Sequence, residues 1–145
     1  MLALNFAPAG TYELLLPFLP KSKNVWEGMP HMHRSGERKK WQKHLDERIE
    51  ELAIPHCDRV RVEVELHHAT NNRRDWQNYF HPMYWFIADA LVRCGVIDDD
   101  DPKRFHVGEN GGIRFIWDRR KYLPAKDRQQ TIVRVWTEEA TADAN

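Results

Sequence analysis

Four consecutive aspartates, Asp98, Asp99, Asp100 and Asp101, are the residues of this sequence that point most directly to chemistry. Like charges this close raise one another's pKa values, and a divalent cation would relieve their repulsion. Asp75 is a second candidate, because it stands between an expected strand and an expected helix. If the fold brings the run back to Asp75, the carboxylates form a hard oxygen site suited to Mg²⁺ or Mn²⁺. Spacing alone leaves the alternatives open, which are a solvated acidic turn and a helix N-cap.

Basic residues gather in two other parts of the chain. Near the start of an expected helix lies one cluster, which consists of Arg34, Arg38, Lys39, Lys40 and Lys43. The other, Arg73 and Arg74, directly precedes the candidate aspartate. A metal site flanked by cations suits phosphodiester chemistry, because the metal stabilises developing negative charge and the cations bind backbone phosphates. By themselves, such lysines and arginines are also ordinary residues of a solvated helix surface.

Other features of the sequence exclude several classes of function. No Cys/His ligand quartet accompanies the eight histidines, so a structural zinc site is not expected. The chain has no nucleophile elbow, P-loop or dinucleotide fingerprint, which argues against acyl transfer and against a nucleotide cofactor. With 22 basic and 22 acidic residues the formal net charge is zero, so any polyanion site must come from local charge separation.

The segments that decide localisation indicate a cytoplasmic protein without a membrane partner. The N-terminus lacks the basic region and the length of a signal peptide, and no apolar stretch reaches the roughly 18 residues of a membrane span. The two cysteines form no CxxC pair, which is typical of reduced thiols.

Hydrophobic periodicity predicts the elements that must position the candidate residues. Strands are expected over residues 11–19, 59–67, 112–118 and 131–137, with a short one over 104–108 that turns through the Asn-Gly-Gly sequence at 110–112. Residues 21–33 are expected to form a loop and residues 138–145 a frayed tail. A helix over 35–52, capped by Ser35, carries Trp41, Leu45 and Ile49 at helical spacing.

A second helix is expected to be firm from about residue 82 to Cys94, with Gly95 as its C′ residue. Its apolar stripe consists of Phe80, Met83, Ile87, Leu91 and Cys94. Together these elements predict a single α+β domain over residues 1–145. The expected architecture is a two-layer sandwich, in which a mixed or largely antiparallel sheet of four to five strands packs against two main helices.

Three segments, in order along the chain, carry a family resemblance. They are residues 16–24 (Leu-Pro-Phe-Leu-Pro-Lys-Ser-Lys-Asn), residues 73–78 (Arg-Arg-Asp-Trp-Gln-Asn) and residues 89–100 (Asp-Ala-Leu-Val-Arg-Cys-Gly-Val-Ile-Asp-Asp-Asp). The first resembles the early strand and Pro/Asn loop of the RusA family of Holliday-junction resolvases, many of which are encoded by phages and prophages. The second is similar to that family's Arg-Asp-x-Asp-Asn signature, and the third to its Asp-x-Leu-x-x-x-Gly-x-x-x-Asp-Asp ending.

This resemblance implies a homodimeric endonuclease that resolves four-way DNA junctions by paired nicks, with Mg²⁺ as cofactor and Mn²⁺ as a substitute. The family's catalytic, metal-binding carboxylates carry over to Asp75, Asp99 and Asp100, and Asp98 takes a variable position. The resemblance therefore implies what spacing does not, namely that Asp75 and the aspartate run meet in one site.

Two positions depart from the family pattern. Gln77 stands where the family has a second acidic residue, and it can complete a metal shell only through its uncharged carbonyl. The nearest counterpart of the family's helix lysine is His81. The alternative hypothesis is therefore a catalytically weakened or inactive junction-binding protein, and a third is an interaction module without a nucleic-acid role. The residues expected to contact DNA are Arg38, Lys39, Lys40, Arg73, Arg74 and His81.

Overall fold

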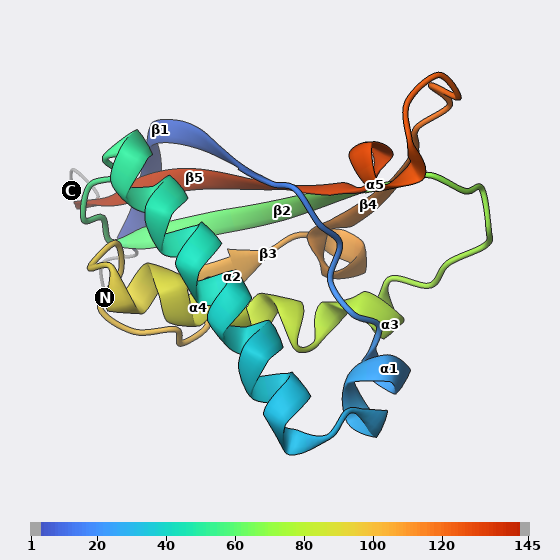
Figure 1. The fold of residues 1–145 in the computed structure, drawn as a ribbon. Coiled ribbons are helices and arrows are strands. Elements are labelled where there is room, and N and C mark those ends of the chain that lie inside the picture. Colours follow the sequence, from blue (N-terminus) through green and yellow to red (C-terminus); the bar gives the residue numbers. More distant parts are fainter. Residues whose placement is uncertain (1–3, 143–145) are drawn as a thin grey trace.

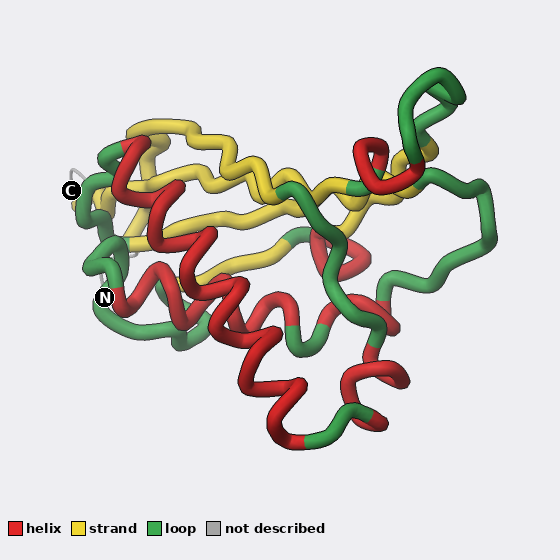
Figure 2. Tube along the Cα trace, viewed as in Figure 1, coloured by secondary structure: helices red, strands yellow, loops and turns green. Residues whose placement is uncertain are grey.

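The central strand of the fold is β2 (Arg59–His68), whose alternate residues are buried. The computed structural model describes residues 4–142, and it has a five-stranded mixed sheet with two main helices, α2 (His31–Leu52) and α4 (Met83–Arg93), on one face (Figures 1 and 2). The predicted fold class is confirmed. The other strands are β1 (Leu4–Leu16), β3 (Phe105–Val107), β4 (Ile113–Trp117) and β5 (Gln130–Ala142).

β2 pairs with other strands along both of its edges. β5 lies between β1 and β2 and is antiparallel to both, whereas β3 and β4 lie one after the other on the opposite side of β2, parallel to it. The expected turn at 110–112 is therefore not a hairpin. Both strands run parallel to β2 and pair with it, not with each other. The connection between them is a short 3-10 turn, Glu109–Gly112.

The N-terminal helices differ from the prediction. Residues 21–33 are not a loop, since α1 (Lys23–Gly28) forms there and Ser22 Oγ accepts a hydrogen bond from the Val25 amide at 3.3 Å. Buried Trp26 anchors this turn, a tertiary contact that local composition does not reveal. α2 begins before the expected cap Ser35, because the Pro30 carbonyl already accepts the first helical hydrogen bonds. Its predicted end at residue 52 is confirmed.

The second predicted helix is confirmed as α4, which begins at Met83, close to the expected residue 82, and ends at Arg93. A short helix, α3 (Gln77–Phe80), precedes α4, and a cis peptide bond joins His81 to Pro82 between them. The apolar stripe is largely confirmed, although Cys94 is exposed. Gly95 has a φ of 75°, as a C′ residue requires. The hydrophobic core contains Met83, Ile87 and Leu91 of α4 together with Trp41, Leu45 and Ile49 of α2.

Strands β1 and β5 reach further toward the chain termini than predicted, whereas β1 ends at Leu16 and not at residue 19. Residues 138–142 are not a frayed tail, because they continue β5 and pair with the start of β1, while Arg59 forms an ion pair with Glu138 at 3.0 Å. The rest of the predicted tail, residues 143–145, lies outside the described residues. No helix within residues 4–142 is long and apolar enough to cross a bilayer.

Gly111 fixes the turn that precedes β4, and its replacement tests this packing. Its φ is 63°, and a Cβ built there lies 2.6 Å from Trp76 Cε3. We expect Gly111→Ala to lower the free energy of unfolding by at least about 1–2 kcal/mol, the scale of a left-handed backbone for an L-residue. Gly36→Ala, in α2 where the added Cβ meets open space, should instead raise it by about 0.5–1 kcal/mol. Urea denaturation measures both, and equal effects would contradict the assignment.

Candidate functional site

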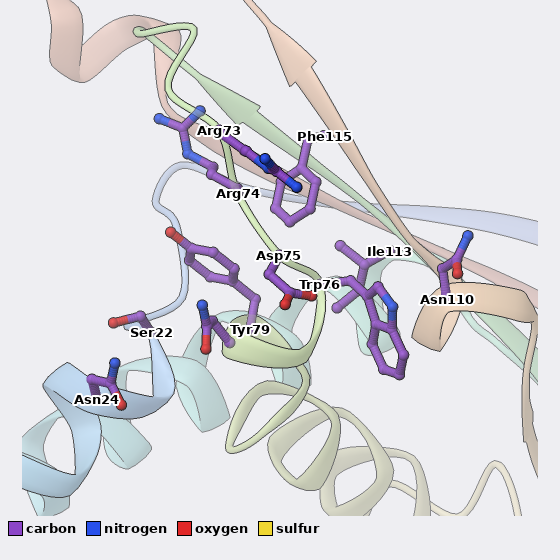
Figure 3. A pocket seen from close by; sticks show the side chains of 11 residues that line it. Ser22, Asn24, Arg73, Arg74, Asp75, Trp76, Tyr79, Asn110, Ile113 and Phe115 are labelled. Carbon is purple, nitrogen blue, oxygen red and sulfur yellow. The ribbon is translucent and has the colours of Figure 1, made fainter.

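A cavity of about 740 Å³ opens where the chain leaves β2 and passes α1 and the 3-10 turn (Figure 3). Its walls are partly aromatic, with Trp76, Tyr79 and Phe115, and partly polar. The polar lining comes from three separate parts of the chain: Ser22 and Asn24 at α1, Arg73, Arg74, Asp75 and Asn78 after β2, and Asn110 in the 3-10 turn. The fold thus gathers groups that bind anions around a single carboxylate.

Asp75 has a structural role at the start of α3. Its Oδ1 accepts a hydrogen bond from the Gln77 amide at 3.2 Å, and its carbonyl accepts one from the Asn78 amide at 3.1 Å. The N-cap position of α3 is Trp76, so the N-cap alternative for Asp75 is wrong in position, although its carboxylate does bind the first amide of the helix. The side chain is also exposed and lies between the rings of Tyr79 and Trp76 at the cavity, so this hydrogen bond does not remove it from contact with a ligand (Figure 3).

Arg74 orders the loop that carries the cations of the cavity. Its guanidinium donates to the carbonyls of Thr70 and Asn72, at 3.2 and 2.7 Å, and to Thr70 Oγ1 at 2.6 Å. Arg73 is exposed beside it. Two guanidinium groups next to a carboxylate can bind a phosphodiester, because arginine matches the geometry of phosphate oxygens.

His68 supports the cavity from the core side. It is buried, and its ring centroid lies 5.9 Å from that of Tyr79 and 5.8 Å from that of Phe115. Burial, followed by the charge of Arg74, lowers the pKa of His68 to about 4. The imidazole is therefore neutral at physiological pH and contributes to the aromatic packing behind the site.

Gln77 and His81 face a different hollow. They line a neighbouring cavity of about 720 Å³ together with Phe80, and Trp76 lies at the border of both cavities. The His81 ring stacks on Trp85 at a centroid distance of 6.1 Å. Gln77 therefore does not line the cavity at Asp75, although its amide donates to the Asp75 carboxylate.

The aspartate run lies at the opposite end of the molecule from Asp75. Arg104, just after the run, accepts a hydrogen bond from the Val60 amide at the start of β2, whereas Asp75 follows the end of that strand. A strand of this length spans on the order of 30 Å. After Asp75 the chain returns along α4, which ends close to the aspartate run, so the length of α4 also separates Asp75 from the run (Figure 1). One chain therefore does not bring Asp75 together with Asp99 and Asp100. Between residues 4 and 142, no group of three or more His, Cys, Asp or Glu is placed to hold a metal ion.

The four aspartates of the run are not equivalent. Asp98 Oδ1 lies 2.9 Å from His56 Nε2, and Asp101 is paired with the Arg104 guanidinium. Asp99 and Asp100 are exposed, and no ion pair engages either of them among the described residues. The outer two carboxylates thus fix the turn that presents the inner two.

The basic cluster of α2 lies apart from the Asp75 cavity. Arg38 lines a hollow of about 300 Å³ with Trp85, and Lys39 is exposed on the same helix. Lys40 Nζ lies 3.3 Å from Glu37 Oε1 and 4.3 Å from the centroid of Phe18. Of the six residues expected to contact DNA, the fold therefore brings only Arg73 and Arg74 to Asp75.

Comparison with known proteins leaves the residues themselves as the basis for a function. The chain matches no protein-family model and no curated protein. Sequence reasoning did not single out Asn24, Asn78 and Asn110 as site residues. The first two stand inside the first and second RusA-like segments, which was the available signal, whereas Asn110 reaches the cavity only through the 3-10 turn.

Proposed function

We propose that this protein is a RusA-like endodeoxyribonuclease that resolves four-way DNA junctions by paired nicks, as a homodimer and with Mg²⁺ or Mn²⁺. The observation that carries the proposal is the convergence of two RusA-like segments on one cavity: Asn24 from the first meets Arg73, Asp75 and Asn78 from the second. The guanidinium groups suit the phosphates of a DNA strand, and Asp75 is an oxygen ligand suited to a hard cation beside them.

A metal site that contains Asp75 together with Asp99 and Asp100 needs two chains. One chain does not fit the metal, because it holds these carboxylates at opposite ends of β2. In a two-fold dimer every contact occurs twice, so bringing Asp75 of one protomer to the Asp99 and Asp100 side chains of its partner forms two identical three-carboxylate sites. Two sites match the two nicks that a two-fold-symmetric junction requires.

In such a dimer, different residues of each chain bind the DNA backbone and position the metal ligands. Arg73 and Arg74 bind the backbone phosphates, and the pairs His56–Asp98 and Arg104–Asp101 hold the turn that presents Asp99 and Asp100. The three carboxylates of such a shared site would hold Mg²⁺, which would supply Lewis-acid stabilisation of the phosphodiester oxygens. For this role in DNA recombination and repair, the compartment we propose is the cytoplasm.

A second candidate function is junction binding without cleavage. The position of Gln77 favours it, since this side chain replaces an expected acid and lines the neighbouring cavity instead of the one at Asp75. The phosphate-binding part of the site does not depend on Gln77, so binding can persist where catalysis is lost.

The test uses a labelled synthetic four-way junction, with a linear duplex of the same sequence as control, in EDTA, Mg²⁺ and Mn²⁺. We expect junction binding that weakens as salt rises, because phosphate contacts release counterions. We also expect paired nicks in the presence of either metal and none in EDTA. Tight binding without nicks in either metal would leave the second candidate, and absence of DNA binding at low salt would reject both.

A further inference from the structure

The loop that joins β4 to β5, residues 118–129, projects beyond the sheet at the end where the Asp75 cavity lies (Figure 1). This β4–β5 loop is the most basic exposed segment that the proposed function has not used. It contains five basic residues and two acidic ones, which are Arg119, Arg120, Lys121, Lys126 and Arg128 against Asp118 and Asp127. In a chain with no net charge, such a segment is a local separation of charge that attracts polyanions.

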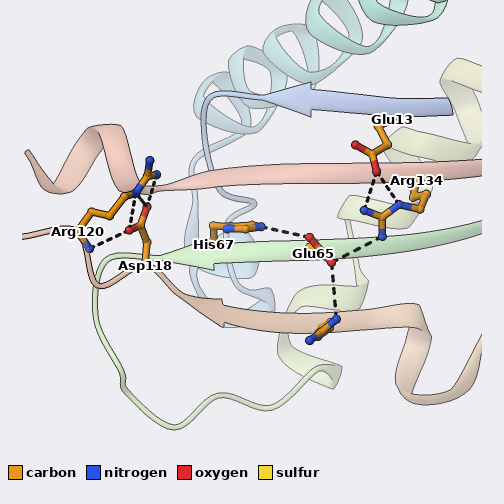
Figure 4. Close-up of polar contacts among 7 residues, drawn as sticks. Glu13, Glu65, His67, Asp118, Arg120 and Arg134 are labelled. Carbon is orange, nitrogen blue, oxygen red and sulfur yellow. Dashed lines mark hydrogen bonds and ion pairs between the residues drawn. The ribbon is translucent and has the colours of Figure 1, made fainter. Parts of the chain in front are cut away.

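The base of the loop is firmly anchored. Asp118 is buried, and its carboxylate accepts hydrogen bonds from the Arg120 guanidinium at 2.6–3.1 Å and from the Arg120 amide at 3.0 Å (Figure 4). These bonds lower the pKa of Asp118 to about 2. Arg128 donates to the carbonyls of Ala69 and Asp118, at 3.2 and 3.3 Å. Two of the five cations therefore hold the loop in place, and the other three are left for a ligand.

The same contacts tie the β4–β5 loop to the segment that carries Arg73 and Arg74. His68 is the register partner of Trp117, its carbonyl accepts a hydrogen bond from the Asp118 amide at 2.8 Å, and Ala69 follows it directly. The two basic segments thus leave the sheet from adjacent strands at one end. DNA bound at the Asp75 cavity therefore has the loop on the side of β4.

Aromatic residues accompany the exposed cations. Tyr122 is 80% exposed near the tip of the loop, which is unusual for so large an aromatic side chain. At the end of β4, the Arg119 guanidinium lies 4.5 Å from the ring centroid of partly exposed Trp117. Cations interleaved with exposed rings are the pattern of surfaces that bind nucleic acid by phosphate contacts and by stacking on bases that have left the duplex stack.

We propose that the β4–β5 loop is a second DNA-binding element, with Arg119, Lys121 and Lys126 on backbone phosphates and Tyr122 stacked on an unstacked base at the branch point. This inference rests on the proposed function and extends it, because stacking on such a base selects a branched junction over a linear duplex. Intact B-form DNA offers the ring no free base face, so there the loop contributes through its charges alone.

The experiment measures binding to a four-way junction and to a linear duplex in EDTA, as a function of salt, so that cleavage plays no part. We expect Lys121→Ala/Lys126→Ala to reduce the slope of log K against log salt by about 1.8, at about 0.9 per lost phosphate contact. Arg48→Ala, which removes a cation of α2 that is already paired with Glu47 and Glu51, is the control and should leave the slope unchanged.

Tyr122→Ala tests the stacking directly. We expect it to weaken junction binding about five- to 150-fold, the range for loss of one stacked base, with duplex binding unchanged. Tyr122→Phe keeps the ring and should restore the junction preference. If the wild type binds DNA but the loop variants show unchanged salt slopes and an unchanged junction preference, this inference is overturned. A wild type that binds neither DNA would instead overturn the proposed function.

Discussion

We expect Asp75→Asn to reduce the proposed metal-dependent cleavage of a four-way junction by at least about a hundredfold, the scale of removing one preorganised electrostatic contact to a transition state. The substitution takes away the carboxylate that lies beside Arg73 and Arg74, and with it a charged ligand for the cation. The asparagine oxygen can still accept the hydrogen bond of the Gln77 amide, so the start of α3 is preserved. Single-turnover cleavage of a labelled junction measures the loss, and binding in EDTA should match that of the wild type.

The matched control is Asp89→Asn, which makes the same chemical change in α4. Asp89 is exposed, pairs with Arg93 at 2.5 Å and lies outside the proposed set of metal ligands, so this variant should keep most of its cleavage activity. An Asp75→Asn protein that cuts at the wild-type rate would remove Asp75 from the site. If instead both substitutions abolish cleavage and lower the unfolding midpoint, the effect comes from the fold.

Short-range patterns predicted the elements whose structure is decided locally. The alternation in β2, the end of α2 before Pro55 and the position of Gly95 after α4 all follow from single-residue properties. The elements that were wrong depend on distant partners. α1 forms around the burial of Trp26, and residues 138–142 stay in a strand because β1 extends to meet them.

The candidate site also has a part that could be predicted from neighbouring residues and a part that depends on the tertiary fold. Arg73, Arg74 and Asp75 are contiguous, so their presence in one cavity could be predicted from the chain itself. The distance from Asp75 to the aspartate run depends on the length and direction of β2 and α4, which together keep the two apart. A sequence motif that names residues of one site does not say whether one chain or two supply them.

Mixing two inactive variants restores cleavage if the carboxylates come from different protomers. The pair is Asp75→Asn in one chain and Asp99→Asn/Asp100→Asn in the other. In their heterodimer, one site receives all three substitutions and the other receives none, so one intact site remains. With random association half of the dimers are mixed, and about a quarter of the wild-type number of sites is active, as two-fold symmetry requires. Each active dimer should make one nick in a junction instead of two.

Sites built within one chain give the opposite result, because every site of that heterodimer then carries a substitution and no activity returns. Co-expression of the two chains with different affinity tags, followed by purification through both, yields the heterodimer without reliance on subunit exchange. Junction binding in EDTA confirms that the preparation is folded, so a lack of cleavage can be assigned to the sites.

Pairing the triple variant, Asp75→Asn/Asp99→Asn/Asp100→Asn, with a wild-type chain reverses the expectation and completes the test. If the protomers share their sites, each of the two sites now lacks either Asp75 or the Asp99 and Asp100 pair, and the purified heterodimer is inactive. If each chain holds its own site, the wild-type chain keeps one active site and the heterodimer still nicks the junction. The two heterodimers contain the same substitutions and differ only in how these are distributed between chains. Opposite activities therefore report on the arrangement of the carboxylates across the dimer, which is the feature that a single chain of this fold does not provide.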